Sequence, residues 1–156
     1  EQLGRIGQRY SKLGFKGIGL GDTTGMATPP IVQNVVKYLQ DTLPELPIGL
    51  HFHNTRGLGL VNVMAGLDEG IDQFDASFGG IGGCPFAPKA TGNICTEDLV
   101  YMLHEMNIDT NIDLQALMEI AIQVEAIVGH DLPGQVMKAG PRLDLHSMTS
   151  VATAQG

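Results

Sequence analysis

Three short apolar segments alternate with segments of helical periodicity along this chain, and this alternation restricts the possible folds more than any other feature. The expected strands cover residues 17–20, 48–53 and 71–76, and a helical segment follows each of them. Strands that alternate with helices form parallel sheets joined by right-handed crossovers. These strands are short and apolar, as strands covered on both faces are. The sequence therefore predicts an α/β fold with a parallel sheet.

The expected helices carry apolar residues at intervals of three and four. They cover residues 3–13, 29–43, 59–69, 96–106 and 113–128. Thr28 and Thr96 are expected to cap the second and fourth of these helices, and Gly14 to end the first. From Gly129 onward the glycines and prolines predict an irregular segment.

A parallel sheet of only three strands would leave two open edges, which is a poor fold on its own. A fragment of a (β/α)8 TIM barrel explains the pattern better, with the last three strand–helix units present and about five of the eight strands missing. The expected division of the chain is residues 1–129 as the C-terminal portion of a barrel catalytic domain and residues 130–156 as an irregular C-terminal tail.

The composition excludes several classes of partner. The chain has 156 residues and a formal charge of −8, which argues against nucleic acid or an anionic membrane surface as partner. An anionic small substrate stays possible, because a bound cation reverses the local field. Only Cys84 and Cys95 are cysteines, and no secretory signal or membrane span is visible, so reduced thiols and a cytoplasmic location are expected.

Polar residues gather where the expected strands end. His51 and His53 are separated by one residue at the end of the second strand, so their side chains should share a face. Asp22 follows the first strand, and a glycine-rich loop with Cys84 and Asn93 follows the third. Ligands of parallel α/β proteins bind at the C-terminal ends of strands, so these groups are expected at one site.

The chemistry of this donor set favours a divalent cation. On spacing alone, a histidine pair is about as often satisfied by hydrogen bonds as by a metal. Imidazole together with oxygen ligands and no thiolate suits Mg²⁺, Mn²⁺ or a similar ion with open positions. Such an ion can polarise a hydroxyl or carboxylate oxygen of a substrate.

Cys84 has two interpretations, a small buried hydrophobic residue or a catalytic thiol on a loop that approaches a ligand. The glycines of residues 79–83 and the prolines at 85 and 88 favour the second. The loop has neither the G-x-G-x-x-G spacing of a dinucleotide site nor the Lys-Ser/Thr ending of a P-loop, so nucleotide binding is not expected. Cys95 is expected to be structural.

Several motifs resemble hydroxymethylglutaryl-CoA lyase, within the wider group of metal-dependent barrel lyases and carboxyltransferases. They are GDTTG at 21–25, HFHNTRG at 51–57, GGIGGCPFA at 79–87, ATGN at 90–93 and TEDLVYML at 96–103. The resemblance runs from about Gly17 to Ile127, and the glycine loop ending in Cys-Pro is its specific part.

The resemblance implies metal ligation by His51, His53 and Asn93. It also implies Asp22 as an active-site acidic residue near the metal, Cys84 as the catalytic cysteine and His51 on the proton path. It implies an acyl-CoA substrate, 3-hydroxy-3-methylglutaryl-CoA, cleaved to acetoacetate and acetyl-CoA. It further implies a possible homodimer, and the mitochondrial matrix as location if the source is eukaryotic.

Two alternatives stay open. One is an acyl-CoA condensing enzyme of the isopropylmalate or homocitrate synthase type, or a related barrel aldolase, because these share the histidine pair. The other is a non-catalytic fragment that only packs or regulates. The family's first strands, which supply an aspartate ligand and an arginine that faces the substrate, have no counterpart here. The chain by itself is therefore expected to be inactive.

Overall fold

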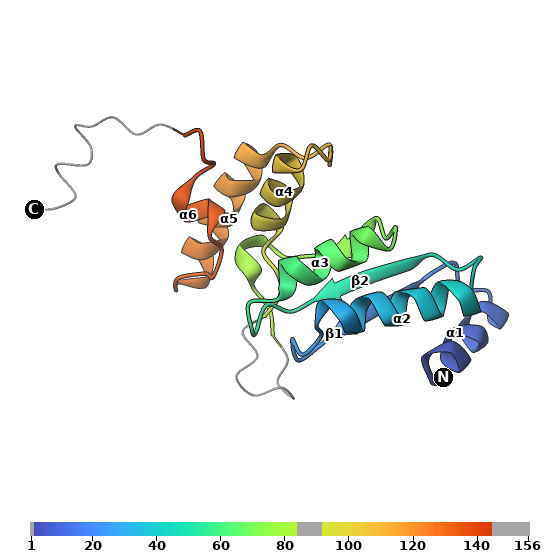
Figure 1. The fold of residues 1–156 in the computed structure, drawn as a ribbon. Helices are drawn as coiled ribbons and strands as arrows, with labels where there is room; N and C mark the ends of the chain where they lie inside the picture. Colours follow the sequence, from blue (N-terminus) through green and yellow to red (C-terminus); the bar gives the residue numbers. More distant parts are fainter. Residues whose placement is uncertain (1, 84–91, 145–156) are drawn as a thin grey trace, which may run out of the picture.

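The structure is a computed structural model that describes residues 2–83 and 92–144 (Figure 1). Its helices are α1 (Gln2–Lys12), α2 (Pro29–Thr42), α3 (Gly59–Asp68), α4 (Thr96–Glu105), α5 (Leu114–Val128) and α6 (Val136–Ala139). Its strands are β1 (Ile18–Asp22), β2 (Ile48–Phe52) and β3 (Gln73–Asp75), and a 3-10 turn, η1, covers Phe78–Gly80.

The described strands form one parallel sheet in the order β1-β2-β3. This confirms the predicted alternation of strands and helices. In the register of the sheet, Gly21 of β1 and Asp75 of β3 both lie opposite His51 of β2. The C-terminal ends of the three strands therefore lie side by side at the same end of the sheet, as the sequence predicted.

Helices α2 and α3 lie side by side over one face of the sheet (Figure 1). That face is apolar because alternate residues of β2, namely Ile48, Leu50 and Phe52, are buried against the helices. The opposite face carries His51 together with the glycines of β1 and β2, Gly19, Gly21 and Gly49. Glycine leaves this face with few side chains beside His51.

Each outer edge of the sheet borders a mostly apolar hollow. The hollow along β1 has a volume of about 510 Å³ and includes Leu20, Val35 and Phe52 in its lining. The hollow along β3 has a volume of about 610 Å³ and includes Phe74 and Leu99. Open apolar edges on both sides are what three strands of a larger closed sheet would show.

Helix α1 does not pack through the apolar face that its periodicity predicts. Its apolar stripe is exposed, from 39% for Ile6 to 45% for Tyr10, whereas Gly4 and Gly7 are buried. The two glycines let the backbone of α1 approach Tyr38 and Leu43 in and after α2. The apolar stripe of α1 is thus left without cover within the described residues.

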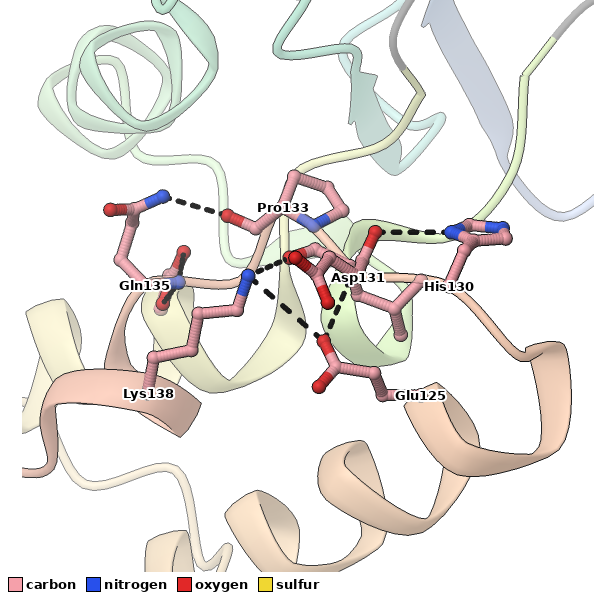
Figure 2. Close-up of polar contacts among 8 residues, drawn as sticks. Glu125, His130, Asp131, Pro133, Gln135 and Lys138 are labelled. Atoms are coloured by element: carbon pink, nitrogen blue, oxygen red, sulfur yellow. Dashed lines mark hydrogen bonds and ion pairs between the residues drawn. The ribbon is translucent and has the colours of Figure 1, made fainter.

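The segment after α5 is held by carboxylates (Figure 2). Glu125 accepts the backbone N–H of Leu132 at 2.7 Å, and Lys138 lies 4.0 Å from the same carboxylate oxygen of Glu125. Asp98 accepts the backbone N–H groups of Gln135 and Val136. The boundary predicted at residue 129 stays a prediction, but residues 130–144 include a helical turn, so this part of the predicted irregular tail is ordered.

Two further details concern helix ends. Thr28 is the N-cap of α2 as predicted, but Cys95 rather than Thr96 is the N-cap of α4. In the part of the chain that the structure describes, none of the helices combines the length and the apolar character of a membrane span.

Candidate active site

The two histidines lie together at the end of β2. Their ring centroids are 5.2 Å apart, which confirms that residues 51 and 53 share a face of the strand. His53 is 6% exposed, whereas the His51 side chain is 32% exposed on the open face. The Nδ1 atom of His51 lies 3.7 Å from a carboxylate oxygen of Asp75 on β3.

Asn93 is brought to His53 by backbone pairing. Residues 92–94 run beside the end of β2, where Asn54 N–H donates to the Gly92 carbonyl and Ile94 N–H donates to the Phe52 carbonyl. His53 and Asn93 are partners in an isolated antiparallel bridge. The structure therefore assembles His51, His53 and Asn93 as the sequence predicted.

Two buried polar atoms at this site have no hydrogen-bond partner, His53 Nδ1 and Asn93 Oδ1. An unpaired buried polar atom costs about 1–3 kcal/mol, so such atoms call for an explanation. An imidazole nitrogen and an amide oxygen are both metal-ligating atoms. The pKa of His53 is lowered overall, first by burial and then by the neighbouring His51, whereas Asp22 and the nearby Asn93 side chain act in the opposite direction. The net lowering favours the neutral imidazole that binds metals.

These three side chains fit part of a cation site. Within residues 2–83 and 92–144, no three His, Cys, Asp or Glu side chains gather closely enough to hold a metal ion. The donor set of the described residues is thus two imidazoles and one amide. Their role as ligands stays a prediction, and further ligands would have to come from elsewhere.

Asp22 lies close to the site but faces other partners. It is opposite Phe52 in the sheet register, and its carboxylate oxygens accept the N–H groups of Met26 at 2.8 Å and Ala27 at 3.1 Å. Its negative charge also opposes part of the lowering of the His53 pKa. The structure therefore gives Asp22 a loop-capping role, and its predicted role as an active-site acid stays a prediction.

Of the two cysteines, Cys95 lies among the described residues. Cys84, the predicted catalytic thiol, lies outside the described residues. Cys95 is a free thiol and is 4% exposed, and burial raises its pKa well above the ordinary value. Cys95 is therefore an unreactive structural thiol, as expected.

Sequence reasoning missed three polar residues that support the site. Glu97 is 0% exposed and accepts the N–H of Gly79 at 3.1 Å. Arg56 donates to the carbonyls of Thr24 and Gly25 and so ties the loop after β1 to the loop after β2. Ser77 donates to the carbonyl of Ile81. Arg56 and Glu97 lie inside the quoted motifs, but no local pattern indicates what these three residues bind, because each partner is fixed by the tertiary fold.

We expect the burial of Glu97 to give the folded chain an unusual pH dependence. Burial raises the pKa of Glu97, so the folded chain retains a proton that the unfolded chain has released. Stability should then fall as pH rises between the two pKa values, by at most about 1.4 kcal/mol per pH unit. Urea unfolding at increasing pH, starting from the ordinary pKa of 4.5, should show this fall in the native sequence but not in Glu97→Gln.

The exposed Glu119→Gln on α5 is the control for loss of one carboxylate. A native sequence and a Glu97→Gln variant with parallel pH profiles would show that Glu97 is ionised in the folded chain.

Three parallel strands with open outer edges, and paired histidines where the second strand ends, fit part of a TIM-barrel enzyme. The sequence profile of the HMGL-like family matches residues 1–124, and the chain belongs to this family. It is hydroxymethylglutaryl-CoA lyase-like, and the family is metal-dependent.

Known proteins agree with this assignment. The chain is 44% identical over 135 residues to a hydroxymethylglutaryl-CoA lyase of Bacillus subtilis, covering 86% of this chain and 45% of the relative. It is also 44% identical over 141 residues to the (R)-citramalyl-CoA lyase of Chloroflexus aurantiacus, covering 90% and 44%.

A solved structure, the HMG-CoA lyase of Acinetobacter baumannii in complex with coenzyme A and 3-methylmalate, matches with a TM-score of 0.87 and 52% identity. The match covers 92% of this chain and 47% of that one. The predicted partial barrel is thereby confirmed. The chain spans less than half the length of these relatives.

Proposed function

We propose that this chain forms the C-terminal part of a carbon–carbon lyase that cleaves 3-hydroxy-3-methylglutaryl-CoA to acetoacetate and acetyl-CoA with Mg²⁺ or Mn²⁺. The observation that carries the proposal is the paired histidines beside two unpartnered buried ligating atoms, His53 Nδ1 and Asn93 Oδ1. The relatives named as lyases of acyl-CoA thioesters support the substrate class. A homodimer remains part of the proposal.

The residues of this chain would have separate roles in cation binding and proton transfer. His51, His53 and Asn93 would hold the cation. When bound, a divalent cation acts as a Lewis acid on substrate oxygens. The hydroxyl proton would leave along a path that includes His51, the more exposed of the two histidines, whose Nδ1 atom lies 3.7 Å from a carboxylate oxygen of Asp75. The carbon–carbon bond then breaks, its electron pair passes to the carbon beside the thioester, and the Cys84 thiol gives that carbon a proton.

The chain should not catalyse this reaction alone. The candidate ligands among the described residues are two imidazoles and one amide, and both outer edges of the sheet are open. We use "complete barrel" for this chain preceded by the strands that close the sheet. We expect cleavage of 3-hydroxy-3-methylglutaryl-CoA by the complete barrel, measured as acetoacetate released in the presence of Mg²⁺ or Mn²⁺, and none above background by this chain alone.

A chimera can provide the test if the N-terminal half is taken from the Bacillus subtilis relative, which is 44% identical over the shared part. The unmodified Bacillus enzyme is the positive control. Full cleavage activity of the isolated chain would contradict the split site, and a complete barrel that binds the cation without cleaving any acyl-CoA would contradict the lyase.

A second substrate is favoured by a specific observation. The (R)-citramalyl-CoA lyase is as similar to this chain, at 44% identity, as the Bacillus hydroxymethylglutaryl-CoA lyase is. The same donor set can serve both substrates, because the walls that select the acyl group include strands outside this chain. A comparison of kcat/KM for the two thioesters decides between them. A condensing enzyme would instead consume acetyl-CoA without releasing acetoacetate.

A further inference from the structure

We propose that Ser77 is a positioning residue for Asn93: its hydroxyl holds the Ile81 carbonyl where that carbonyl takes the Asn93 amide nitrogen, which leaves the amide oxygen for the cation. The inference rests on the proposed function in so far as it takes Asn93 to be a ligand. It adds a residue with no direct part in binding or chemistry.

One carbonyl oxygen joins the two side chains. Ser77 Oγ donates to the Ile81 carbonyl at 2.6 Å, and Asn93 Nδ2 donates to the same oxygen at 2.9 Å. A carbonyl oxygen has two lone pairs and can accept both bonds. The position of the Ile81 oxygen therefore sets the position of the amide nitrogen of Asn93.

This contact decides which end of the amide faces the site. An asparagine side chain has a donor end and an acceptor end of nearly the same shape, and only the oxygen is a ligand for a hard cation. A carbonyl partner accepts N–H and repels a second oxygen, so the Ile81 carbonyl selects the nitrogen. The oxygen that remains, Asn93 Oδ1, is buried and has no partner.

Ser77 is itself held firmly. Its N–H donates to the Ile94 carbonyl at 3.2 Å, and its own carbonyl accepts the N–H groups of Thr96 at 2.9 Å and Gly80 at 3.0 Å. The chain then folds back through η1, where Gly79 and Gly80 have φ values of 57° and 74°, so that residue 81 returns to the Ser77 hydroxyl. The Ser77 hydroxyl, held in place by its backbone, thus meets the Ile81 carbonyl, whose position depends on the two glycines.

A double-mutant cycle on metal affinity tests the inference in the complete barrel. The variants are Ser77→Ala, Asn93→Ala and the double variant, and calorimetry measures the Kd for Mn²⁺. We expect Ser77→Ala to weaken Mn²⁺ binding about 10-fold, a typical effect for a residue that orients a ligand. In the Asn93→Ala background the same change should have no further effect.

Two controls accompany the cycle. Ser77→Thr keeps a hydroxyl on an extended backbone and should restore affinity, whereas Ser11→Ala on exposed α1 should leave it unchanged. A Ser77→Ala variant with native affinity, or one that weakens Mn²⁺ binding equally with and without Asn93, would overturn the inference.

A metal-free measurement separates this inference from the proposed function. With ¹⁵N-labelled asparagine, hydrogen exchange of the Asn93 side-chain amide should be slow in the native sequence and in Ser77→Thr, and faster in Ser77→Ala. Equal exchange in Ser77→Ala and the native sequence would overturn the positioning role. A native complete barrel that binds no Mn²⁺ would contradict the proposed function. The exchange measurement would still test whether Ser77 positions the Asn93 amide.

Discussion

Replacing His53 with leucine in the complete barrel should lower kcat/KM for thioester cleavage on the order of a thousandfold, because Lewis-acid stabilisation of the reacting oxygens contributes several kcal/mol. His53 is the more buried member of the histidine pair, and its Nδ1 atom has no partner among the described residues. The loss should appear together with a large rise in the Kd for Mn²⁺, measured by calorimetry.

The same change should leave the free energy of unfolding unchanged or raise it. A buried polar atom without a partner costs about 1–3 kcal/mol, and leucine removes that cost in a pocket of similar size. The control is His130→Ala, an exposed histidine whose Nδ1 lies 3.0 Å from the carbonyl oxygen of the neighbouring Asp131 (Figure 2). Unfolding in urea measures the stability of both variants. A His53→Leu variant that cleaves at the native rate would remove His53 from the site.

The parts of the site that could be predicted from the sequence depend on local geometry. The alternation of side chains along a strand is enough to place His51 and His53 on one face. The parallel arrangement of strand–helix units is enough to bring Asn93 to the same edge of the sheet. Neither inference needs knowledge of which helix packs where.

The parts that could not be predicted depend on contacts between distant segments. The stripe of α1 predicts a buried apolar face, yet Gly4 and Gly7 are the residues that touch α2, and Leu3 and Leu13 are exposed. Glu97 looks like an ordinary acidic residue in the first turn of a helix, where the helix dipole favours it. Only the fold brings it under Gly79 and buries it completely.

Asp22 shows the same limit of sequence analysis, although its sequence position did indicate a role at the site. Its place after a strand predicts a role at the site, but strand geometry also makes it the partner of Phe52 rather than of His51. The backbone N–H groups of Met26 and Ala27 then occupy its carboxylate. The residue type and its position along the strand indicate a site. The turn that follows determines which groups bind the carboxylate.

Replacing Gly92 with alanine in the complete barrel should abolish tight Mn²⁺ binding, with a loss of at least about 100-fold, and lower cleavage accordingly. Gly92 has a φ of 104° and precedes Asn93. A Cβ atom there would overlap the Gly82 carbonyl oxygen and lie 2.9 Å from the Gly80 carbonyl oxygen. Both obstacles are backbone atoms, so residues 80–82 or residue 93 must move. Either movement breaks the contact between Asn93 and Ile81.

Gly14→Ala is the matched control for this prediction. Gly14 also has a positive φ, 85°, but an added Cβ meets nothing within 4 Å. Alanine at Gly14 should therefore cost only backbone strain, about 1 kcal/mol of stability, and leave the Kd for Mn²⁺ unchanged. If Gly92→Ala lowered stability by the same amount and kept native Mn²⁺ affinity, close packing of the glycine loop on residues 92–93 would not be what holds the Asn93 ligand in place.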